Sequence, residues 1–213
     1  NWTDRVIESK EIVPDFDKLL ASFLDKQDDY GIINSINGPF RKLFKKSLID
    51  ELRFDENLNY GEDLLFNIEY ILRIKNAKLV NIKFYNYFVN NQSSISHSYN
   101  KNIIFNSNLM FEKMEKVILD HGKMSSQTKD LLNSYKLYTF YMQLKSYYLP
   151  AQDYELLDKN MPLVKDILVK KYIMRFSKRS QLVFSLIRFR LYRLATFFIK
   201  SNTNKNTEEA TFI

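Results

Sequence analysis

Two adjacent carboxylates are the residues of this chain that could do chemistry. Glu62 and Asp63 follow Gly61 and open a predicted helix, directly after a polar loop. Carboxylates are favoured there because the first amides of a helix lack partners and the helix dipole is positive at that end. This capping role alone accounts for the residues. The same position also keeps a carboxylate ionised and rigid at the edge of a cleft, which is what a general base needs.

Short elements on either side must position this pair. Apolar residues at helical spacing predict helices at 16–28, 40–52 and 62–75, with loops at 30–38 and 53–60. The apolar side of the second helix is expected to be Leu43, Phe44, Leu48 and Leu52. Aromatic and β-branched residues predict two short strands at 79–82 and 84–89, before a loop at 90–100.

The remainder of the chain reads as helical from residue 101 to residue 200, with breaks near 122–126, Pro150 and Pro162. Residues 175–200 combine many apolar side chains with basic residues and contain no acidic one. Such a helix suits the surface of an anionic membrane. It suits equally well a core or dimer helix whose arginines extend to solvent. Residues 201–213 read as a flexible tail.

Composition narrows the class of protein. The chain has 213 residues, a net charge of +7, no cysteine, and only four glycines and four prolines. These numbers exclude disulfides and thiolate metal sites, and the scarcity of glycine and proline favours helices. The basic pI near 9.3 is the only argument for nucleic-acid binding, because no nucleic-acid-binding motif is present. We therefore expect no nucleic-acid partner.

Neither a signal peptide nor a membrane span is visible in the sequence. The most apolar window, 182–199, is interrupted by Arg188, Arg190 and Arg193. The chain begins with Asn1 rather than Met, so we expect a fragment of a longer protein. The expected location is the cytoplasm, with a peripheral position at the inner face of the plasma membrane.

The region from Asn37 to His97 resembles the acceptor-side half of a family-2 glycosyltransferase. In that family, found in bacterial enzymes that build surface glycans, a turn and a short helix precede a Phe-Asp-Glu stretch and a Gly-Glu-Asp helix. A tyrosine-rich strand and a Ser-Ile-Ser loop follow. The matching segments here are Asn37–Pro39, Lys42–Phe44, Phe54–Glu56, Gly61–Asp63, Tyr85–Phe88 and Ser94–His97.

The resemblance implies a GT-A fold and an inverting transfer of a sugar from a nucleotide-diphosphate donor. It implies that Asp63 is the base that takes the acceptor's proton and that Glu62 supports it. Asn37, Gly38, Lys42 and Tyr85 would bind substrate, and His97 would help to hold Mg²⁺ or Mn²⁺ on the diphosphate. The family's nucleotide-binding half, with its Asp-x-Asp metal site, has no counterpart in this chain.

Each of these roles has a structural alternative. His97 could be a loop histidine that faces solvent. Lys42, with Lys45 and Lys46, could form a solvated helix face. Tyr85, with its aromatic neighbours, could serve packing of a strand rather than stacking on a sugar. These alternatives stay open at the level of sequence.

The sequence thus predicts an α/β fragment of a GT-A fold, with two short strands and helices, followed by a mostly α-helical region. The expected domains are residues 1–100, the acceptor side, and 101–200, the helical region. The predicted function is sugar transfer to a growing bacterial glycan, from a nucleotide-sugar donor to a glycan or lipid-linked acceptor. The alternative is a non-catalytic module that docks on a partner transferase or a membrane. Self-association is expected where the missing half leaves an apolar surface.

Overall fold

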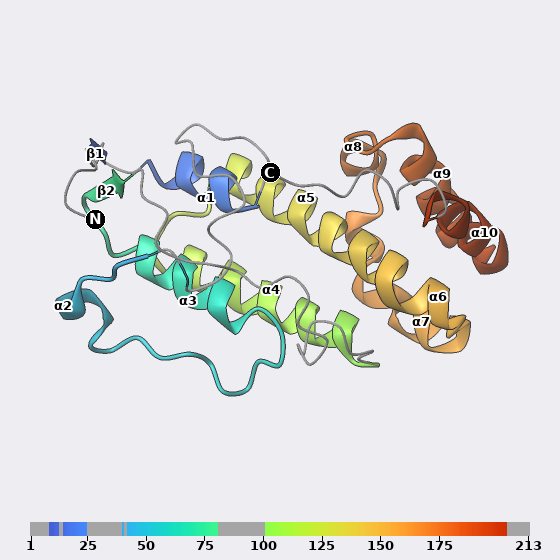
Figure 1. Cartoon of the computed structure of the whole chain (residues 1–213), viewed down its shortest axis with the longest axis horizontal. Helices are drawn as coiled ribbons and strands as arrows, with labels where there is room; N and C mark the ends of the chain where they lie inside the picture. The colour runs from blue at the N-terminus through green and yellow to red at the C-terminus, as the bar shows by residue number, and fades with distance from the viewer. Residues whose placement is uncertain (1–8, 13–14, 25–39, 41, 81–100, 204–213) are drawn as a thin grey trace, which may run out of the picture. The chain divides into compact units, whose positions relative to one another are not determined.

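Most of the residues that the structure describes are helical (Figure 1). The structure is a computed structural model, and it describes residues 9–12, 15–24, 40, 42–80 and 101–203. The expected α/β fold is therefore wrong. Within the described ranges, β-structure is confined to one antiparallel pair of four-residue strands, β1 (Ser9–Ile12) and β2 (Ala77–Val80).

The chain divides into two compact units. The first consists of Asn1–Ser98 and Leu109–Leu132, and the second of Tyr99–Asn108 and Asn133–Ile213. The division falls inside two long helices, α4 (Ile103–Asp120) and α5 (Ser126–Gln143). The first unit thus includes part of the region in which the sequence predicted a separate helical domain.

Helices predicted from apolar periodicity form the body of the first unit. They are α1 (Phe16–Leu24) and α3 (Glu62–Ile71), and the final turns of α4 and first turns of α5 join them. Asp17 on α1 accepts hydrogen bonds from the hydroxyls of Ser125 and Thr128 at the start of α5. The buried core contains Leu19, Leu20, Leu52, Leu58, Leu64, Leu65, Ile68, Met110, Phe111, Met114, Ile118, Leu131 and Leu132.

The strand pair joins segments that are far apart in the sequence. In its register, Ser9 lies opposite Val80 and Ile12 lies opposite Ala77. β2 overlaps the first strand predicted from the sequence, whereas β1 was not predicted. The second predicted strand, at 84–89, lies outside the described residues.

The helix predicted at 40–52 is wrong in most of its length. Among the described residues of this range, only α2 (Lys46–Ile49) is helical, and residues 42–45 have no regular structure. Leu43, which was expected on the apolar side, is 95% exposed. The reason is tertiary: Phe44 packs against the rings of Phe66 and Tyr70 on α3, and these contacts replace the helical ones.

Short helices build the second unit around the end of α5. After a π-helical segment (Leu144–Tyr148) come α6 (Leu149–Ala151), α7 (Tyr154–Asn160), 3-10 turns at Met161–Leu163 and Lys165–Ile167, α8 (Lys170–Ile173), α9 (Lys178–Arg188) and α10 (Tyr192–Thr203). The predicted break near 122–126 lies between α4 and α5, and those predicted at Pro150 and Pro162 lie within one or two residues of the ends of α6 and α7. The core of this unit contains Leu137, Phe140, Leu144, Tyr148, Leu149, Leu157, Phe184, Ile187 and Ala195.

The single basic helix expected at 175–200 is instead two helices that pack on each other, α9 and α10 (Figure 1). The Leu191 N–H donates to the Leu186 carbonyl and the Arg190 N–H donates to the Ile187 carbonyl, a Schellman motif that ends α9. Arg190 occupies the left-handed position with φ of 58°, where glycine is usual. Because the sequence has no glycine there, periodicity alone did not reveal the break.

Across the described ranges, no helix is both long enough and apolar enough to cross a bilayer.

Candidate functional site

Gly61 fixes where α3 begins. Its φ of 73° lies in the left-handed region, and its carbonyl accepts the first helical hydrogen bond from the Leu65 N–H at 3.0 Å. A Cβ at this position would lie 2.9 Å from the Cγ of Met110, on α4 of the same unit. Both the backbone and the close packing therefore require glycine. The result is a helix start held rigidly against α4.

Asp63 lies in the first turn of α3 and is half-buried. Its Oδ1 accepts a hydrogen bond from the Leu64 N–H at 2.7 Å. Burial raises the pKa of Asp63 and the neighbouring Glu62 carboxylate raises it further, while the Leu64 N–H and the charge of Lys42 lower it. The carboxyl is therefore a stronger proton acceptor than an exposed aspartate, as a general base requires.

Lys42 is the cation that acts on this carboxyl. It is half-buried in the segment before α2, and burial lowers its pKa from 10.5 to about 8, although the negative charge of Asp63 acts to raise it. The structure thus brings together Lys42 and Asp63, which the sequence had named for different roles. A lysine with this pKa is still mostly protonated at neutral pH.

Aromatic contacts hold the Lys42 segment against α3. The ring of Phe44 meets those of Phe66 and Tyr70 edge to face, with centroids 5.5 and 4.8 Å apart. Phe54 stacks on Phe66 at 4.6 Å. The Lys45 N–H donates to the Tyr70 hydroxyl at 2.9 Å. These contacts explain why the chain before α2 stays against α3 without being helical.

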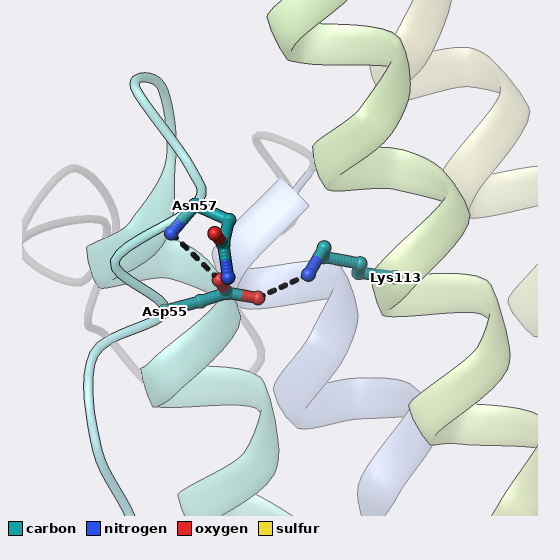
Figure 2. Close-up of polar contacts among 3 residues, drawn as sticks. All are labelled: Asp55, Asn57 and Lys113. Carbon is teal, nitrogen blue, oxygen red and sulfur yellow. Dashed lines mark hydrogen bonds and ion pairs between the residues drawn. The ribbon is translucent and has the colours of Figure 1, made fainter.

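Asp55 anchors the loop that leads to Gly61 (Figure 2). Its Oδ1 accepts the Asn57 N–H at 3.0 Å, and its Oδ2 pairs with the ammonium of Lys113 on α4. The hydrogen bond from Lys113 lowers the pKa of Asp55. The Phe-Asp-Glu stretch of the resemblance therefore has a positioning role here. Lys113 could not be identified from the sequence, because its pairing with Asp55 depends on how α4 packs.

Several predicted site residues lie outside the described residues: Asn37, Gly38, Tyr85 and His97. Their predicted roles stay predictions. Glu62 is half-buried beside Asp63, at the first position of α3. Among the residues that the structure describes, no group of three or more His, Cys, Asp or Glu side chains could hold a metal ion. The described part of the site thus offers Mg²⁺ or Mn²⁺ no more than the Glu62 and Asp63 pair.

No protein-family model, curated protein or solved structure matches this chain. The resemblance to family-2 glycosyltransferases accordingly stays a prediction from the sequence.

Proposed function

We propose that this chain provides the acceptor side of a sugar-transfer reaction, with Asp63 as the general base. The observation that carries the proposal is the position of Asp63: a half-buried carboxyl with a raised pKa, at a rigid helix start, with Lys42 acting on its charge. The ordered motifs between residues 37 and 97 supply the reaction class. The proposal does not need a GT-A fold.

The chemistry follows from the acidity of an alcohol. A sugar hydroxyl is too weak an acid to ionise before reaction, so its proton must leave while the oxygen attacks the donor carbon. Asp63 would accept that proton. Lys42 would favour the ionised form of Asp63 before the reaction.

The donor's diphosphate has to be held by residues other than those described. Departure of a nucleoside diphosphate needs a metal ion or a cationic clamp, and the acceptor base cannot replace either. Under this proposal Mg²⁺ or Mn²⁺ would supply that charge, with His97 as a ligand and with further ligands outside the described residues.

The test is the Asp63→Asn variant of the natural protein that carries this chain. Asparagine keeps the size of the side chain and its acceptor for the Leu64 N–H, but it cannot take a proton. Transfer of labelled sugar to membrane glycan should fall about a hundredfold or more. The control is Asp50→Asn, since Asp50 is an exposed aspartate at the end of α2. Unchanged transfer by a folded Asp63→Asn protein would refute the assignment and favour a non-catalytic module.

A second candidate function, attachment to an anionic membrane surface, has an observation of its own. Phe189 and Phe197 are 74% and 66% exposed, beside the basic side chains of Arg188, Arg190 and Arg193. Exposed rings beside cations are the pattern of a peripheral lipid-binding surface. In this reading the break between α9 and α10 presents Phe189 at a corner of the second unit.

Vesicle flotation tests this second candidate. The chain should bind phosphatidylglycerol vesicles, bind phosphatidylcholine vesicles far less, and dissociate as salt rises. Phe189→Ser combined with Phe197→Ser should weaken binding, whereas Phe105→Ser, which changes an exposed ring on α4, should not. Equal binding to both lipids would remove the electrostatic part of this candidate.

A further inference from the structure

A cleft in the second unit is lined mainly by basic and apolar side chains. Its volume is about 620 Å³, within the range of ligand-binding pockets. It is formed by the end of α7, the turns that follow it, the start of α8, the end of α9 and the start of α10. The lining residues are Asp158, Met161, Pro162, Lys165, Leu168, Val169, Lys170, Ile187, Arg188, Arg190 and Tyr192.

The one carboxylate in this lining is already engaged. Asp158 Oδ1 accepts a hydrogen bond from the Tyr192 hydroxyl at 2.5 Å, and its Oδ2 lies 3.2 Å from a guanidinium nitrogen of Arg190. Burial and the bond to Asp158 raise the pKa of Tyr192, so its hydroxyl keeps the proton that it donates. The charge of Asp158 is thus largely balanced within the cleft.

Three further cations face the same cleft. Lys165, Lys170 and Arg188 come from three different elements, and none of them forms an ion pair with another described residue. Like charges repel, so the grouping of these exposed cations does not stabilise the fold. An anion bound between them would remove that repulsion. Within the lining, Met161, Pro162, Leu168 and Ile187 offer an apolar surface beside the cations.

We propose that this cleft binds an organic phosphate. A phosphate group carries enough charge and enough acceptor oxygens for several cations, and the planar guanidinium of arginine matches two of those oxygens at once. The apolar lining would take the organic part of the ligand. This inference is independent of the role proposed for Asp63, because every lining residue belongs to the second unit.

A substitution of Arg190 can change ligand binding without lowering the stability of the fold. Arg190 holds the left-handed position at the end of α9, where glycine would be less strained. The same motif ends α4, and there the left-handed position is occupied by Gly122. Arg190→Gly should therefore leave the melting temperature of the chain unchanged or higher, while it removes one cation from the cleft.

The experiment is calorimetric titration of the whole chain with inorganic phosphate and with hexyl phosphate, and flotation with phosphatidylcholine vesicles that contain phosphatidic acid. We expect saturable binding of hexyl phosphate, tighter than that of inorganic phosphate. Arg188→Gln and Arg190→Gly should each weaken it about tenfold, the loss expected for a charge-assisted hydrogen bond. Lys178→Gln is the matched control, because Lys178 is an exposed cation on α9 that does not line the cleft.

The vesicle arm identifies the source of the phosphate. Vesicle binding that Arg188→Gln abolishes and Lys178→Gln preserves would indicate a lipid headgroup, and binding of hexyl phosphate alone would indicate a soluble ligand. Equal losses from Arg188→Gln and Lys178→Gln would overturn the proposal, because binding would then follow net charge. Absence of saturable binding to all three probes would overturn it as well.

Discussion

Lys42 and Asp63 have pKa values shifted in opposite directions by the same cause. Burial disfavours the charged form of each, so the lysine pKa falls to about 8 and the aspartate pKa rises. Each charge partly opposes the shift of the other. This mutual dependence gives the site a measurable signature that neither residue would have alone.

We predict that the ammonium of Lys42 titrates near pH 8 and that this midpoint depends on Asp63. After reductive methylation with ¹³C-formaldehyde, one dimethyl-lysine NMR signal should move with a midpoint well below that of the others, and Lys42→Gln should abolish it. In Asp63→Asn the midpoint should fall further, because the carboxylate that favours the charged lysine is gone. A midpoint that Asp63→Asn leaves unchanged would show that the two groups do not interact.

The effect of these shifts on stability has a defined sign. The folded chain binds fewer protons at Lys42 than the unfolded chain between about pH 8 and 10.5, so the Lys42 contribution to stability rises over that window. Asp63 acts in the opposite sense. Its folded pKa lies above the ordinary aspartate value of 3.8, so its contribution to stability falls as pH rises from 3.8 through that higher pKa.

For individual residues, the sequence predicts well those features that depend on residues nearby in the chain. The position of Asp63 at a helix start follows from the loop, the glycine and the apolar spacing around it, and the structure has it there. The pairing of Asp55 with Lys113 could not be predicted, because it joins residues on a loop and on α4 that are far apart in the chain. Nor could the burial of Lys42, which depends on contacts of Phe44 with α3.

Two helix ends of the first unit use a glycine with positive φ, and they differ in what surrounds it. Gly61 has a φ of 73° and would bring a Cβ within 2.9 Å of Met110, whereas Gly122 has a φ of 64° and nothing within 4 Å. Both positions thus favour glycine for its backbone conformation, but only Gly61 also requires glycine for lack of space.

We predict that Gly61→Ala destabilises the first unit more than Gly122→Ala does. The Gly122 variant should lose about 1 kcal/mol, the usual penalty for a left-handed alanine. The Gly61 variant should lose about 2–3 kcal/mol, because Met110 must also move. Urea unfolding, together with hydrogen exchange of the α3 and α4 amides, measures the loss of stability in both variants. Equal losses would mean that Met110 yields without penalty.

Elements whose apolar residues face one continuous surface were predictable, and elements defined by distant contacts were not. The spacing of apolar residues correctly indicated α1 and α3. The same kind of spacing at 40–52 was misleading, because rings on α3 bind Phe44 in a non-helical segment. The break after α9 was missed since an arginine, not a glycine, takes the left-handed position.

For the whole molecule, we predict that this chain alone does not transfer sugar. In the proposed function Asp63 acts only on the acceptor, whereas departure of the donor's diphosphate needs a metal ion or a cationic clamp. Titration calorimetry of the purified chain with nucleotide sugars and Mg²⁺ or Mn²⁺, together with a hydrolysis assay, measures this. Metal-dependent binding at micromolar affinity would contradict the prediction, and Glu62 and His97 would then be the ligands to mutate.

The pairing of β1 with β2 has a consequence for the order of events during synthesis. The register places Ile12 opposite Ala77, so the pair closes a loop of chain that contains α1, α2 and α3. A ribosome adds about 5–20 residues per second, so β1 leaves the exit tunnel several seconds before β2 does. Helices form within about a microsecond, far inside that interval. The strand pair can therefore form after α1, α2 and α3 have been made, but before the parts of α4 and α5 that complete the first unit. Until β2 emerges, the edge of β1 lacks its partner strand.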